Sequence, residues 1–273
     1  MDKNLLFMPK IIFKTLLLII FSFNINCHAG FKSDNKNIIT FNSDDGIKLL
    51  ETSRFKNDFY TLINFYQPQI NPIYCSAATA TTILNALNYS NISNQKHRQI
   101  LKPLSQGGGV IKYHLYDQEH FFNSKTDKIK NINIINFKIP KKITKNKAHY
   151  DPGVTLSEFS KILSNIYDLD ITKKHVTNSS KKDFNQFKQD LINTLNNKNK
   201  FIVANFHGKK LKLKTHGHIS PIIAYNEQNN KILIMDVALH KQLWYWADIK
   251  KFYNAMKTKD GKNYRGYLII SKK

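Results

Sequence analysis

The segment that most directly indicates the fold is residues 66–88, YQPQINPIYCSAATATTILNALN. Pro68 and Pro72 restrict its first half to extended or turning backbone. Small residues follow Cys75 and predict a helix over residues 76–88. The apolar surface of that helix consists of Ala77, Ala78, Ile83, Leu84, Ala86 and Leu87. We therefore expect Cys75 at or near a helix N-terminus.

Downstream of this helix, further helices give way to short apolar runs. Two amphipathic helices are predicted: one from Thr155, with Glu158 completing a capping box, to about Tyr167, and one over 181–196. Strands are predicted at 201–206, 219–225, 231–237 and 267–271, with a hairpin turn at 226–230. Helices first and antiparallel strands later predict an α+β domain.

Composition narrows the classes of protein that the chain can belong to. Its 273 residues with 41% hydrophobic content can bury a core, which excludes a collagen, a coiled coil or a fully disordered chain. The formal net charge is +23, but only three basic residues are arginines. Because nucleic-acid recognition relies on the forked guanidinium, we predict no nucleic-acid partner. The lysine run at 209–214 is expected in a solvated hairpin or loop.

The first 29 residues have the pattern of a secretory signal peptide. Three lysines precede a short apolar run at 15–23, and Cys27-His28-Ala29 is an imperfect cleavage site. The run is too short to span a bilayer comfortably, so we expect an exported, periplasmic or secreted protein. A lipid anchor at Cys27 and a buried first helix are the alternatives.

The rest of the chain carries no internal repeat and no linker that divides it. Residues 30–45 are a polar lead segment. Residues 96–150 are expected to form loop-rich surface insertions, with glycines at 107–109 and a segment at 131–140 that alternates like a strand.

Cys75 is the first candidate for chemistry. Cys27 is the other cysteine of the sequence, so removal of the leader would leave Cys75 without an internal disulfide partner. The partial positive charge of a helix N-terminus stabilises a thiolate, the nucleophilic form. The side-chain amide of Gln69 could return beside the Cys75 N–H, and the two could hold an oxyanion. The alternative is that Cys75 is an inert core residue.

A second candidate pair is His218, at the start of one predicted strand, and Asp236, at the end of the next. Across a hairpin the carboxylate could orient the imidazole as a general base requires. The plainer interpretation places both on the surface. His216 and His218 would share a strand face, so a metal site with His207 or His240 is a further alternative.

At these windows the sequence resembles the phytochelatin synthase family, papain-like cysteine peptidases that act on glutathione. The matching motifs are Gln69 and Cys75 followed by Leu84-Asn85-Ala86-Leu87, Gly217-His218-Ile219-Ser220-Pro221-Ile222, Met235-Asp236-Val237-Ala238, and the stretches 153–156, 253–256 and 265–271. Several motifs in the same order are more specific than any one of them. The resemblance covers residues 46–273, which we expect to be the catalytic domain.

The resemblance implies a papain-like fold, in which the helical part carries the cysteine and the antiparallel sheet carries the histidine and the aspartate. It implies that Cys75 is the nucleophile, His218 the general base and acid, Asp236 its orienting partner and Gln69 an oxyanion donor. The implied reaction cleaves the Cys-Gly bond of glutathione. The γ-glutamylcysteinyl thioester would pass to water or to a second glutathione.

Two departures from the family bear on this expectation. Leu239 stands where the family has an arginine associated with substrate anchoring in plant members, and Lys241 is the candidate substitute. The sequence has no counterpart of the cysteine-rich C-terminal region of plant members, which is linked to the response to metals. We expect no required cofactor, with cadmium or zinc as a potential activator through metal–glutathione thiolates. A homodimer is expected from the family alone.

Two other functions stay open from the sequence. A secreted basic protein on a papain-like scaffold could bind a polyanion without using Cys75. A general papain-like peptidase would cleave peptides that lack a γ-glutamyl group.

Overall fold

The computed structural model describes residues 35–88, 99–100, 112–113, 115–130 and 153–273, which belong to one unit of the chain, residues 31–273. Four predictions lie outside the described residues: the signal peptide at 1–29, the lipid anchor at Cys27, the glycines at 107–109 and the strand at 131–140. Within the described ranges, no helix is long and apolar enough to cross a membrane.

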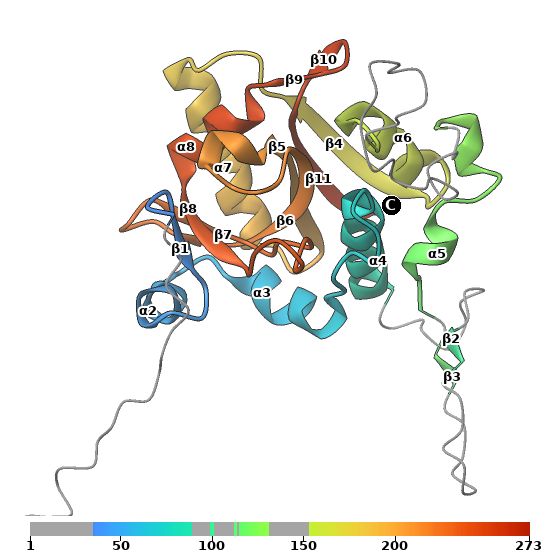
Figure 1. Cartoon of the computed structure of the whole chain (residues 1–273), viewed down its shortest axis with the longest axis horizontal. Helices are drawn as coiled ribbons and strands as arrows, with labels where there is room; N and C mark the ends of the chain where they lie inside the picture. Colours follow the sequence, from blue (N-terminus) through green and yellow to red (C-terminus); the bar gives the residue numbers. More distant parts are fainter. Residues whose placement is uncertain (1–34, 89–98, 101–111, 114, 131–152) are drawn as a thin grey trace, which may run out of the picture. The chain divides into compact units, whose positions relative to one another are not determined.

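An antiparallel sheet of seven strands, in the order β1-β8-β7-β6-β5-β11-β4, organises the described residues (Figure 1). Its strands are β1 (Ile38–Thr40), β4 (Leu169–His175), β5 (Lys200–His207), β6 (Gly217–Asn226), β7 (Lys231–Ile234), β8 (Tyr245–Asp248) and β11 (Gly266–Lys272). Two short hairpins pair β2 (Gln99–Ile100) with β3 (Lys112–Tyr113) and β9 (Lys259–Asp260) with β10 (Asn263–Tyr264).

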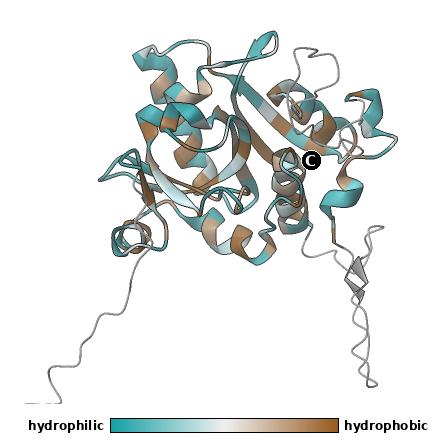
Figure 2. Cartoon of the chain, in the orientation of Figure 1, coloured by the Kyte–Doolittle hydropathy of each residue, from teal (hydrophilic) through white to brown (hydrophobic). Residues whose placement is uncertain are grey.

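Successive residues of a strand point to opposite faces of the sheet. Each face therefore has its own hydrophobic core, and helices cover both faces. In β5, Phe201 and Val203 belong to the core shared with α4 (Cys75–Leu87) and α6 (Leu156–Asn165). Ile202 and Ala204 belong to the core shared with α7 (Lys181–Leu195) and α8 (Ile249–Met256). The other helical segments are α2 (Asp44–Glu51), α3 (Asn57–Leu62), η1 (Ile63–Phe65), α5 (Gln118–Phe121), η3 (Thr126–Lys128) and η5 (Gly208–Leu211). Figure 2 shows hydrophobic stretches along α3 and α4 in brown.

The structure confirms the α+β class and most of the predicted elements. The three predicted helices are α4, α6 and α7, and the capping box of Thr155 and Glu158 is present. The four predicted strands are β5, β6, β7 and β11, although β7 ends at Ile234 rather than at residue 237. The predicted turn joins β6 to β7.

The expected order of helices first and strands later is incomplete. β1 lies within the predicted polar lead and pairs with β8, and β4 lies between α6 and α7. The lysine run at 209–214 forms a short 3-10 turn and loop, as expected. Its two leucines, Leu211 and Leu213, are buried in the core and attach that loop to the fold.

Candidate active site

Cys75 is the first residue of α4 and is half-buried. Asn71 shapes the turn before it: its backbone carbonyl accepts the N–H of Tyr74 at 3.0 Å, and its side-chain carbonyl accepts that of Ile73 at 3.1 Å. The first N–H groups of a helix have no partner within it, so the backbone at Cys75 offers donors and partial positive charge to an anion. The predicted location of Cys75 at a helix start is confirmed.

Helix α4 lies against β6, the strand that carries His218. The alanines in the first turns of α4 are fully buried, and small side chains let the helix approach the sheet closely. Thr79 donates its hydroxyl to the carbonyl of Ile219 at 3.1 Å. Ile219 follows His218 directly, so this bond fixes the start of α4 beside the histidine. Cys75 and His218 line the same cavity, and Cys75 lies close enough to help raise the pKa of His218.

His218 connects the thiol to a buried carboxylate. Its Nε2 is 2.8 Å from Asp236 Oδ1, and Ser220 Oγ is 3.1 Å from the same nitrogen. These contacts leave Nδ1 as the nitrogen available to Cys75. Burial lowers the pKa of His218, but the charge of Asp236 and the hydrogen bonds with Asp236 and Cys75 outweigh burial and raise it to about 10. His218 is therefore protonated at neutral pH.

Asp236 stays ionised although its side chain is fully buried. Burial raises the pKa of its carboxyl, but the positive charge and hydrogen bond of His218 outweigh burial, and hydrogen bonds from Gln242 and the Ala238 N–H lower the pKa further. The hydroxyl of Tyr66 donates to the backbone carbonyl of Asp236 at 3.0 Å. The predicted juxtaposition of His218 and Asp236 is present, and it is buried rather than on the surface.

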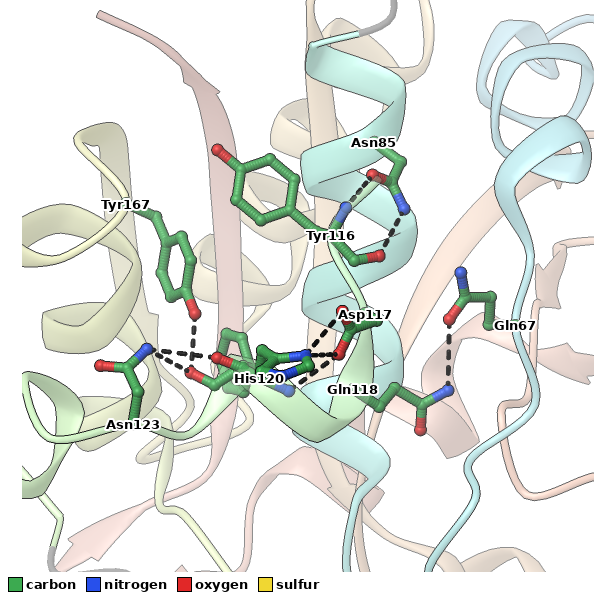
Figure 3. Close-up of polar contacts among 9 residues, drawn as sticks. Gln67, Asn85, Tyr116, Asp117, Gln118, His120, Asn123 and Tyr167 are labelled. Atoms are coloured by element: carbon green, nitrogen blue, oxygen red, sulfur yellow. Dashed lines mark hydrogen bonds and ion pairs between the residues drawn. The ribbon is translucent and has the colours of Figure 1, made fainter. Parts of the chain in front are cut away.

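Helix α5 is anchored between α4 and the residues that follow α6 (Figure 3). Asn85 of α4 accepts the N–H of Tyr116 at 2.8 Å and donates to its carbonyl at 3.0 Å. Tyr167 donates its hydroxyl to the carbonyl of Phe121 at 2.6 Å. These bonds hold α5 in place from both sides.

Gln118 of α5 fixes the backbone on either side of Gln69. Its side chain is buried, accepts the N–H of Ile70 at 3.1 Å and donates to the carbonyl of Pro68 at 2.9 Å. Figure 3 shows the same amide reaching Gln67. The segment that leads to Cys75 is therefore positioned by α5.

Gln69 lines the same cavity as Cys75, as the oxyanion prediction requires. Its backbone N–H donates to the carbonyl of Val237 at 2.8 Å, next to Asp236. One N–H of its side-chain amide donates to the carbonyl of Asn71 at 2.8 Å. An amide nitrogen carries two hydrogens, so a second donor remains for a ligand.

Cys75 opens into a cavity of about 540 Å³ that His218 also lines. Arg265 and Asp260 line it as well, with 3.0 Å between Nη2 and Oδ1, and Asn205 donates to Asp260 Oδ2 at 2.9 Å. Burial lowers the pKa of Arg265, and the charges of Asp260 and Cys75 oppose that shift. The cavity thus presents a cation and an anion beside the thiol.

Unpaired polar atoms gather in this cavity. Eight buried side-chain atoms of the described residues have no hydrogen-bond partner, and four belong to cavity-lining residues: Gln69 Oε1, His207 Nδ1, Thr215 Oγ1 and Arg265 Nε. Buried polar atoms in proteins are nearly always paired. Their concentration here indicates a binding site for a polar ligand.

The remaining candidates from the sequence have mixed outcomes. Lys241 lines the cavity, whereas Leu239 lines a separate apolar hollow of about 230 Å³. His207 and His216 line the cavity with ring centroids 5.8 Å apart, and His240 does not line it. Among the residues that the structure describes, no three His, Cys, Asp or Glu side chains gather as a metal site.

Sequence reasoning missed Arg265, Asp260 and Asn205. Arg265 is one of only three arginines in the chain, which is a signal, but its burial depends on the hairpin of β9 and β10. Asp260 and Asn205 carry no local signal, because polar residues near turns and in strands are common.

A thiol at a helix start, a protonated imidazole and a buried carboxylate are the groups of cysteine-dependent hydrolases and acyltransferases. These enzymes form an acyl intermediate on the cysteine sulfur. Within this class, the chain belongs to the phytochelatin synthase family, whose family model matches residues 33–267.

Similar proteins carry the name glutathione gamma-glutamylcysteinyltransferase. The one from Schizosaccharomyces pombe is 38% identical over 120 residues, which are 43% of this chain and 28% of that protein. Protein 3 from Lotus japonicus is 26% identical over 216 residues, 78% of this chain and 37% of the relative. Protein 1 from Arabidopsis thaliana is 25% identical over 240 residues, 86% and 42% respectively. The chain spans less than half the length of these relatives.

Proposed function

We propose that the chain is a thiol-dependent glutathione γ-glutamylcysteinyltransferase with a papain-like catalytic domain at residues 46–273. The proposal rests chiefly on one observation: Cys75 and His218, which contacts Asp236, line one cavity together with the buried Arg265 and the partly buried Asp260. Family membership supports the same reaction.

In the proposed reaction the Cys75 thiolate attacks the carbonyl carbon of the Cys-Gly bond. The oxyanion receives hydrogen bonds from the Cys75 N–H and the spare N–H of Gln69. When the C–N bond breaks, protonated His218 gives its proton to the departing glycine nitrogen, and a γ-glutamylcysteinyl thioester remains. Water or the α-amino group of a second glutathione then attacks the thioester carbonyl, His218 accepts the proton of the attacking group, and the C–S bond breaks to release the Cys75 thiolate.

The cavity supplies complementary groups for both ends of glutathione. The γ-glutamyl end carries a carboxylate and an ammonium on one carbon, which suit the free Nε of Arg265 and the carboxylate of Asp260. The glycine end carries a second carboxylate, and Lys241 is the lysine that we assign to it.

Three further expectations stay proposals. We propose that residues 1–29 direct export and are then removed. We also propose that cadmium or zinc acts as a glutathione thiolate, which is substrate, rather than as a resident cofactor. The third proposal is a homodimer, which the family resemblance implies.

The test is glycine release from glutathione by the full chain, with and without cadmium, and with thiol products identified by mass. Cys75→Ala should abolish release, whereas Cys27→Ala, which removes the other cysteine, should not. Glycine with γ-glutamylcysteine alone would show hydrolysis, and (γ-glutamylcysteine)2-glycine would show transfer. Release that survives Cys75→Ala, or no release at all, would refute the proposal; salt-dependent polyanion binding by Cys75→Ala would then favour a binding protein.

A further inference from the structure

The two oxygens of Asp236 have different donors. Oδ1 receives the Nε2 of His218 and the N–H of Ala238, both at 2.8 Å. Oδ2 receives the Nε2 of Gln242 at 2.6 Å. A fully buried carboxylate oxygen without a donor is costly, more so than a neutral group. Gln242 therefore donates a hydrogen bond to the carboxylate oxygen that His218 does not contact.

A tight turn after β7 brings Gln242 back to Asp236. The N–H groups of Lys241 and Gln242 both donate to the carbonyl of Ala238, at 2.7 and 3.2 Å. The chain then continues into β8 at Tyr245. Gln242 is half-buried and does not line the cavity, so its amide faces the aspartate and not the ligand.

We propose that Gln242 is a positioning residue, which holds the Asp236 carboxylate in the plane that faces His218 and keeps it ionised. The inference rests on the proposed function, because it assigns a role within the same Cys75 chemistry. Without the amide, Oδ2 would be free to turn away or to take up a proton. A protonated Asp236 no longer stabilises the imidazolium that must donate to the leaving amine.

Gln242 is the side chain whose hydrogen bond reaches Asp236 Oδ2, and the buried hydroxyl of Tyr245 lies nearby without a hydrogen bond of its own. The titratable side chains whose charge interacts with the carboxylate are His218 from β6, Tyr245 from β8, Tyr66 from the segment before Cys75, and His240 from the turn. Gln242 is neutral, so its replacement by another neutral residue changes no formal charge near the pair.

Two substitutions separate positioning from simple packing. Gln242→Leu removes the donor and should lower kcat by about 10- to 100-fold, with KM changed less than about threefold, at every pH. Gln242→Glu keeps the shape and can donate only when protonated, since two adjacent carboxyls share one proton. The kcat of Gln242→Glu should be near that of the unchanged chain at about pH 5.5. At about pH 8 it should be as low as the kcat of Gln242→Leu.

The matched control is Gln189→Leu, since Gln189 is an exposed glutamine of α7 whose amide donates to Asn193 at 2.8 Å. It should leave kcat, KM and the pH profile unchanged. Equal losses for Gln242→Leu and Gln242→Glu at all pH values, or a kcat for Gln242→Leu within twofold of the unchanged chain, would overturn the inference.

A second measurement keeps this inference separate from the proposed function. Histidine-selective 15N NMR follows the titration of His218 without any substrate. Gln242→Leu should shift the acid-side titration of the His218–Asp236 pair upward by about one pH unit, because loss of a donor favours protonation of the carboxylate. An unshifted titration would overturn the inference, whereas absence of glycine release by the unchanged chain would refute only the proposed function.

Discussion

Asp236→Asn separates charge from shape at the proposed site. Asparagine has nearly the same volume but lacks the carboxylate that, with the Cys75 contact, raises the pKa of His218 to about 10. Burial, the largest influence on that pKa, is then opposed only by the Cys75 interactions, so the pKa should fall toward the ordinary value of 6.5. A pKa of 6.5 lowers the protonated fraction of His218 at about pH 8 from about 99% to about 3%. The proton donor for the leaving amine becomes about 30-fold scarcer.

The assay is glycine release from glutathione across about pH 5 to 10.5, measured for the unchanged chain and for Asp236→Asn. In the unchanged chain, the rate of glycine release should fall on the alkaline side of its pH profile near pH 10. In the variant, this fall should move toward about pH 6.5. Denaturant unfolding gives a second readout: a raised histidine pKa stabilises the fold fully below about 6.5, and this contribution is lost as pH rises through 10. A fall in rate that stays near pH 10, or a rate at about pH 8 above a third of normal, would refute the reasoning.

Three further outcomes follow from contacts described above. Arg265→Met should raise the KM for glutathione by about 10- to 100-fold with a smaller change in kcat; the exposed Arg54, changed to Met, is the control, and an equal effect there would contradict the assignment. Thr155→Ala removes the capping box of α6 and should cost about 1 kcal/mol, seen as a fall in Tm of about 2–4 °C; an unchanged Tm would contradict it. Asp58 is buried without a partner, and burial raises the pKa of its carboxyl, so Asp58→Asn should stabilise the fold increasingly as pH rises above about 4; a gain that does not vary with pH in denaturant titrations would contradict this.

The residues that sequence reasoning found are those with a local signal. Cys75 follows two prolines and begins a run of small residues, so its place at a helix start depends on neighbours in the chain. His218 and Asp236 lie at the ends of consecutive strands, and a hairpin brings such ends together whatever the rest of the fold does. Family motifs at the same positions then indicated the chemistry.

The residues that it missed depend on distant contacts. Asp260 and Gly261 have the sequence of an ordinary hairpin turn, and only the folded chain places Asp260 against Arg265 and Asn205. β4 was missed because an edge strand tolerates lysines that would mark a loop elsewhere, as Lys173 and Lys174 do.

The position of β11 inside the sheet governs when the cavity beside Cys75 can be completed during synthesis of the chain. β11 inserts between β5 and β4, and Arg265 immediately precedes it. A growing chain that already contains Cys75 and His218 still lacks the strand that joins two parts of the sheet, along with the arginine of the cavity. Because long-range strand pairing is slow and cooperative, such a chain cannot complete its sheet. Cys75 would therefore face a finished cavity only after almost all residues to Lys272 have been made.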